Sequence, residues 1–153
     1  MSQRSLPETI DSISVAWLTS ALQNSGESSQ LQVASLSAET IAVGQGFASG
    51  LGRLTIEYAP GSMPGPKTLI AKVPSPHVPT RKFLTTLGAY EREVRFYQNV
   101  ASEIPMRTPK CFFAQWESET YDYIILLEDI ANLRSLDQMA GCPIDDAELV
   151  VTK

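Results

Sequence analysis

The sequence predicts an α+β fold, in which an antiparallel sheet of about five strands carries one packed helix and a further helix precedes the sheet. Short segments with strand periodicity follow one another through turns rich in glycine and proline, which favours antiparallel pairing. The glycine stretch lies between two predicted strands rather than between a strand and a helix, which excludes a parallel dinucleotide-binding unit. A length of 153 residues suits one domain with its own core.

The first part of the chain, residues 1–30, is predicted to be a helix followed by a linker. Residues 15–22 have helical spacing of apolar side chains, and Ser14 can serve as the N-cap. Residues 24–30 are polar and contain a glycine, which is typical of a connecting segment. The region 31–43 that follows is predicted to be the first strand.

Lys72 lies in the middle of an apolar strand, and a cation in that position needs a physical explanation. Residues 51–58 alternate with period two and predict a strand, 60–66 form a turn, and 68–73 predict the next strand. Burying an unpaired ammonium group costs several kcal/mol, so such a lysine usually has an anionic partner or ligand. The alternative is a lysine at a sheet edge whose ammonium group reaches water.

A long helix is predicted over about residues 80–102, and it offers the lysine a partner. Its apolar stripe consists of Leu87, Tyr90, Val94, Tyr97 and Ala101. Glu93 flanks this stripe and is the predicted partner of Lys72, whereas Glu91 faces water with Arg95 at i,i+4. The alternative for Glu93 is a solvated carboxylate at the edge of the helix.

The glycine stretch before residue 52 fits a phosphate-binding turn. Against the pattern Gly-x-Gly-x-x-Gly-x-Val, the chain has Gly44, Gly46, Ser49 and Leu51. Ser49 replaces the third glycine and could supply a hydroxyl, and Leu51 stands where an apolar cover over adenine is wanted. Ile70 shares the face of the lysine by alternation and would contact the base. The alternative is an ordinary hairpin turn that binds nothing.

Two further strands are predicted at 111–117 and 121–128. The apolar run from residue 123 onward predicts a strand buried on both faces, and it ends in two carboxylates. At its exit, backbone groups of Glu128 and Ile130 are placed to meet the edge of a base. The alternative is a strand end with solvated acidic side chains.

Composition excludes several classes of function. The net charge of −5 and the lack of a basic run argue against binding to nucleic acid or an anionic membrane. No apolar stretch has membrane-spanning length, and the N-terminus lacks the pattern of a signal peptide, so we expect a cytoplasmic protein. Cys111 and Cys142 lack metal-site spacing, and His77 stands alone between prolines, so no metal site is predicted.

Taken together, these segments resemble the N-terminal lobe of the kinase-like small-molecule phosphotransferases, the group of aminoglycoside phosphotransferases and choline kinases. The resemblance is closest to the ecdysteroid-kinase-like branch. The stretches that carry it are 44–53, 69–74, 90–97, 109–112, 126–130 and 137–142. It implies ATP with Mg²⁺ as cofactor and a small hydroxyl-bearing molecule as substrate. It also implies that Lys72 holds phosphate oxygens and that Glu93 orients Lys72.

The resemblance further implies an ATP-binding small lobe over residues 31–130 and, over 131–153, a linker and the start of a C-terminal lobe. In that family the catalytic aspartate loop, His-Gly-Asp, and the magnesium ligands belong to the second lobe. This chain contains no His-Gly-Asp. We therefore expect a fragment without catalytic residues or metal ligands, inactive by itself. The alternative is a degenerate kinase-like module, or a remnant, that acts only in protein interaction.

Overall fold

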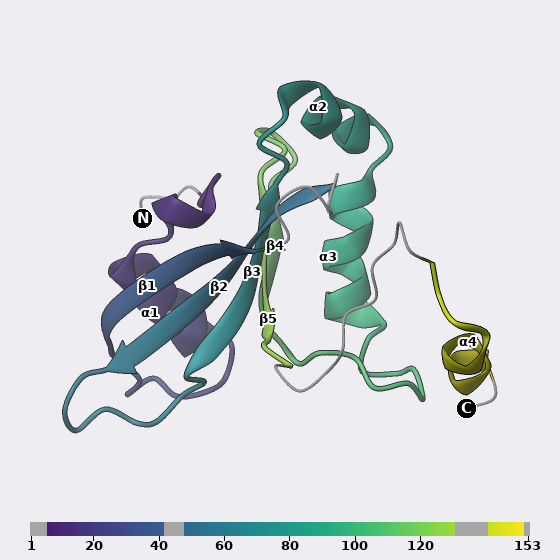
Figure 1. The fold of residues 1–153 in the computed structure, drawn as a ribbon. Coiled ribbons are helices and arrows are strands. Elements are labelled where there is room, and N and C mark those ends of the chain that lie inside the picture. The colour runs from purple at the N-terminus through teal and green to yellow at the C-terminus, as the bar shows by residue number, and fades with distance from the viewer. Residues whose placement is uncertain (1–5, 42–47, 131–140, 152–153) are drawn as a thin grey trace.

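The computed structural model describes residues 6–41, 48–130 and 141–151, and it confirms the α+β fold. Five antiparallel strands form one sheet in the order β1-β2-β3-β5-β4 (Figure 1). The strands are β1 (Val33–Ile41), β2 (Ser49–Tyr58), β3 (Thr68–Pro74), β4 (Cys111–Trp116) and β5 (Tyr123–Glu128). The helices are η1 (Ile10–Ser12), α1 (Val15–Asn24), α2 (Val78–Thr86), α3 (Ala89–Asn99) and α4 (Ile144–Val151).

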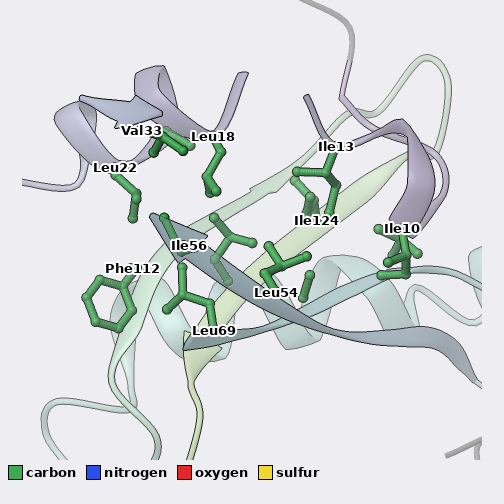
Figure 2. Close-up of a cluster of buried hydrophobic side chains, with 14 of the residues drawn as sticks. Ile10, Ile13, Leu18, Leu22, Val33, Leu54, Ile56, Leu69, Phe112 and Ile124 are labelled. Carbon is green, nitrogen blue, oxygen red and sulfur yellow. The ribbon is translucent and has the colours of Figure 1, made fainter. Parts of the chain in front are cut away.

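One face of the sheet is covered by η1 and α1, which come from the N-terminal segment (Figure 1). Helix α1 begins where predicted, because the Ser14 side chain accepts a hydrogen bond from the backbone N–H of Trp17 at 3.1 Å. Its Leu18 and Leu22 pack with Leu54 and Ile56 of β2 in the main apolar core (Figure 2). The N-terminal helix is therefore an integral layer of the fold.

The other face of the sheet is covered by α3 (Figure 1). A second apolar cluster lies between them, and its buried members are Tyr90, Val94, Tyr123, Ile125 and Leu127. The intervening β5 residues Ile124 and Leu126 belong to the first cluster. Strand β5 is thus buried on both faces, as its continuous apolar sequence predicts.

The prediction of a single helix over 80–102 is wrong. Two helices, α2 and α3, meet at Gly88, whose φ of +64° lies in the left-handed region that favours glycine. The Gly88 N–H donates to the Thr85 carbonyl at 2.9 Å and closes the end of α2. As a result Leu87 leaves the predicted apolar stripe and is exposed, and Ala101 lies beyond the end of α3.

Gly52 allows β2 and η1 to approach closely on the face opposite to α3. A Cβ at this position would lie 2.5 Å from Cγ2 of Ile10 and 2.9 Å from its Cδ1. Its neighbours along the strand, Leu51 and Arg53, point to the other face by alternation. Gly52 therefore has a packing role, on the side of the sheet away from Lys72.

Among the residues that the structure describes, no helix combines the length and apolar character required to cross a bilayer.

Candidate functional site

Lys72 lies on an interior strand of the sheet. Strand β3 pairs with β2 on one side and with β5 on the other, and Lys72 is opposite Leu51 and Ile125. This position rules out the alternative of a lysine at the sheet edge. The Lys72 side chain is 21% exposed, so it is partly accessible to solvent.

The Lys72 ammonium group forms an ion pair with Glu93 of α3. The contact joins Lys72 Nζ to Glu93 Oε1, and the Glu93 side chain is 30% exposed. This is the carboxylate that helical periodicity selects. Glu91, two residues earlier in the helix, instead pairs with Arg95 at 2.7 Å, as the i,i+4 spacing predicts.

Apolar side chains surround Lys72 on the α3 face of the sheet. Ile70 packs against the cluster that contains Leu127, so it shares this face with Lys72 as strand alternation predicts. Leu51 of β2 is half-buried directly across from Lys72, and Ser49 starts the same strand opposite Pro74. Gly44 and Gly46 lie outside the described residues.

The exit of β5 contains Glu128 and Ile130, both half-buried. Glu128 is committed to the neighbouring segment: its N–H donates to the Lys110 carbonyl at 2.8 Å, and its Oε2 accepts from the Lys110 N–H at 3.1 Å. Arg107 also approaches its carboxylate at 3.3 Å. The Glu128 side chain therefore braces the loop before β4 and is not a simple solvated acid.

An ion pair between Arg53 and Asp129 lies beside this exit, and the sequence analysis missed it. Arg53 Nε is 2.8 Å from Asp129 Oδ2, and a second guanidinium nitrogen is 3.4 Å from Oδ1. The Asp129 side chain is only 6% exposed. The hydrogen bond and the charge of Asp129 raise the pKa of Arg53. The sequence did contain one signal for Arg53: strand alternation on β2 places it on the same face of the sheet as Leu51. Alternation does not indicate Asp129 as its partner.

The sequence analysis also missed hydrogen bonds of Tyr90, which it placed only in an apolar stripe. The Tyr90 hydroxyl donates to the Ala48 carbonyl at 2.9 Å and accepts from the Ser75 N–H at 3.1 Å. Its ring stacks on Tyr123 with centroids 4.2 Å apart. Burial raises the pKa of Tyr90, so the hydroxyl stays protonated and able to donate.

The arrangement is suited to binding an anionic group. One half-buried ammonium group is held by a carboxylate, with apolar side chains beside it, and an ammonium group has three hydrogen-bond donors to share between partner and ligand. Within residues 6–41, 48–130 and 141–151, no three His, Cys, Asp or Glu side chains gather as they would around a metal ion. These residues can hold and orient an anion electrostatically.

A model of the ecdysteroid kinase-like family matches residues 43–153, which include Lys72 and Glu93. The chain belongs to the ecdysteroid kinase-like family. This membership places it among the kinase-like phosphotransferases, and its sheet and helices are consistent with a kinase-like N-terminal lobe. Helix α1 and strand β1 precede the matched region but pack into the same core. No curated protein and no solved structure matches the chain.

Proposed function

We propose that this ecdysteroid kinase-like chain binds ATP through Lys72 and forms the nucleotide-binding part of a phosphotransferase that acts on a small hydroxyl-bearing molecule. The observation that carries the proposal is the Lys72–Glu93 ion pair on the α3 face of the sheet. Kinases hold ATP phosphates with a strand lysine that is oriented by a helix glutamate.

The pair is suited to phosphate because Glu93 takes only part of the hydrogen-bonding capacity of Lys72. One carboxylate oxygen contacts the ammonium group, which leaves donors for phosphate oxygens. Glu93 also limits the rotamers of the lysine, so less conformational entropy is lost when ATP binds. Lys72 thus serves as an electrostatic clamp and Glu93 as its orienting residue.

The base would lie beside Lys72, against apolar side chains of neighbouring strands. Leu51 and Ile70 supply these surfaces, and backbone groups of Glu128 and Ile130 at the strand exit would meet the base edge. The sequence pattern assigns the phosphate cradle to the backbone of Gly44, Gly46 and Ser49.

Bound ATP would supply the phosphoryl group, and Mg²⁺ would neutralise charge on its phosphates. The residues of this chain bind the nucleotide and orient it, with Lys72 against phosphate oxygens. We assign no metal ligand among them.

Isothermal titration of the full chain with Mg-ATP and with adenosine tests the proposal. Lys72→Met should weaken ATP binding by about tenfold or more, since a charge-assisted hydrogen bond contributes about 1.5–3 kcal/mol. Glu93→Gln should weaken it less, because the ammonium group remains. Adenosine affinity should not change. Glu91→Gln is the matched control, because Glu91 is on the same helix and pairs with Arg95 instead of Lys72.

Equal ATP affinity in the wild type and Lys72→Met would refute the assignment of Lys72. Absence of ATP binding by the wild type would favour the alternative, a kinase-like module that acts through protein interaction alone.

A further inference from the structure

The hydroxyl of Tyr90 joins the ends of two neighbouring strands. It donates to the carbonyl of Ala48, directly before β2, and accepts from the N–H of Ser75, directly after β3. These two ends of the sheet lie together, because Ser49 pairs with Pro74. Tyr90 is 2% exposed, and its contact with the Ser75 N–H is buried whereas its contact with the Ala48 carbonyl is part-buried. Both contacts are therefore better shielded from water than surface hydrogen bonds.

Tyr90 lies one turn before Glu93 on α3, and both side chains face the sheet. The helix that holds Lys72 through Glu93 therefore also holds the backbone at the start of β2. Any shift of α3 along or away from the sheet would move both attachments together.

The ring of Tyr90 has little freedom to move away from this position. It stacks on Tyr123 of β5, with an interplanar angle of 16°, and Tyr123 is fully buried. Burial also raises the pKa of Tyr123 well above its usual range. The Tyr123 hydroxyl is buried close to the Ser49 side chain, and the stack holds the two rings in place.

We propose that Tyr90 is a positioning residue for ATP phosphates: it fixes the end of the glycine stretch relative to the Lys72–Glu93 pair. The inference rests on the proposed function, because it concerns how that same site is held in shape. Helix α3 then sets the start of β2 and the phosphate-binding lysine as one unit. The binding of a nucleoside such as adenosine, which has no phosphates, would not depend on this unit.

The variant Tyr90→Phe tests the proposal, because it keeps the stacked ring and removes only the hydroxyl. Tyr97→Phe is the matched control, since it removes a hydroxyl from the same helix without affecting Ala48 or Ser75. We expect Tyr90→Phe to weaken Mg-ATP binding roughly three- to tenfold, the usual contribution of a buried hydrogen bond. Adenosine binding should be unchanged, and Tyr97→Phe should bind both ligands as the wild type does.

Hydrogen exchange provides a second readout, on the wild type and on Tyr90→Phe. In the wild type, Mg-ATP should slow exchange together in peptides that cover 48–52, the Ser75 amide and 89–94. Adenosine should not produce this joint protection. In Tyr90→Phe without nucleotide, the Ser75 amide should exchange faster, since it has lost its acceptor.

The outcomes separate this inference from the proposed function. If the wild type binds ATP and Lys72→Met does not, but Tyr90→Phe binds ATP normally, the role of Tyr90 is refuted and the nucleotide site stands. Equal weakening of ATP and adenosine by Tyr90→Phe would also refute it, because that is the result of a merely structural role. If the wild type binds no ATP, both proposals are overturned.

Discussion

The packing of Gly52 against Ile10 makes a prediction that involves no ligand. In Gly52→Ala, the new Cβ would lie 2.5 Å from Ile10 Cγ2, 2.9 Å from Cδ1 and 3.0 Å from Cγ1. The first two distances are shorter than carbon atoms tolerate and the third is at the limit, so either η1 must move or Ile10 must change rotamer. Ile10 is 6% exposed within the main core, which restricts both movements (Figure 2).

The size of the effect follows from two opposing contributions. Overpacking a core costs about 1–3 kcal/mol, whereas replacing a glycine within a strand by alanine recovers about 0.5–1 kcal/mol of conformational entropy. We therefore expect a net loss of about 1–2 kcal/mol in the free energy of unfolding. For a chain of this size that corresponds to a decrease in Tm of roughly 2–8 °C.

A double-mutant cycle in urea separates the clash from any other effect of the substitution. Ile10→Ala alone should cost about 2–5 kcal/mol, because it leaves a cavity. In the double variant the clash disappears and the alanine at 52 fills part of that cavity, so the two losses should be less than additive by about 1–3 kcal/mol. Additive losses would show that Ile10 is not what requires glycine at this position.

Two further predictions concern other elements. Asp122→Asn should lower the free energy of unfolding by roughly 1–3 kcal/mol. The Asp122 side chain is 10% exposed and forms an ion pair with Arg81 of α2, so the substitution removes this carboxylate and loosens α2 from the start of β5. Urea denaturation measures this change. Glu8→Gln is the near-neutral control, because Glu8 is the exposed second partner of Arg81. Equal losses of stability in Asp122→Asn and Glu8→Gln would contradict the prediction. Burial raises the pKa of Cys111 to about 11 from 9.0. The folded chain therefore favours the neutral thiol, and the contribution of this thiol to the free energy of unfolding is complete below pH 9 and is lost as the pH rises through 11. At pH 8 its alkylation should be about a hundredfold slower in the folded than in the unfolded chain, and equal rates by mass spectrometry would refute the burial argument.

Local periodicity predicted the elements around the site because each depends on neighbouring residues. Alternation along residues 51–58 predicted a strand, and the continuous apolar run from 123 predicted a strand buried on both faces. The 3.6-residue period of the helix was sufficient to choose Glu93 over Glu91 as the partner of Lys72. The same periodicity failed at Gly88, because apolar spacing continues across a residue whose backbone leaves the helical region.

Contacts between distant segments were not predictable in this way. Arg53 and Asp129 are separated by 76 positions, and they meet only because β5 lies next to β3, with β2 on the other side. The two backbone partners of Tyr90 come from the ends of two different strands. No local pattern records which ends of which strands adjoin.

The sequence alone determined that an apolar strand carries a lysine, that a helix has one carboxylate on the flank of its apolar stripe, and that a glycine stretch precedes both. These are properties of short segments, in which side-chain direction follows directly from backbone period. The tertiary structure alone decided that α1 and α3 cover opposite faces, that Gly52 accommodates Ile10, and that Tyr90 ties β2 to β3. Those contacts depend on strand order and register, which result from burying both faces of the sheet at once.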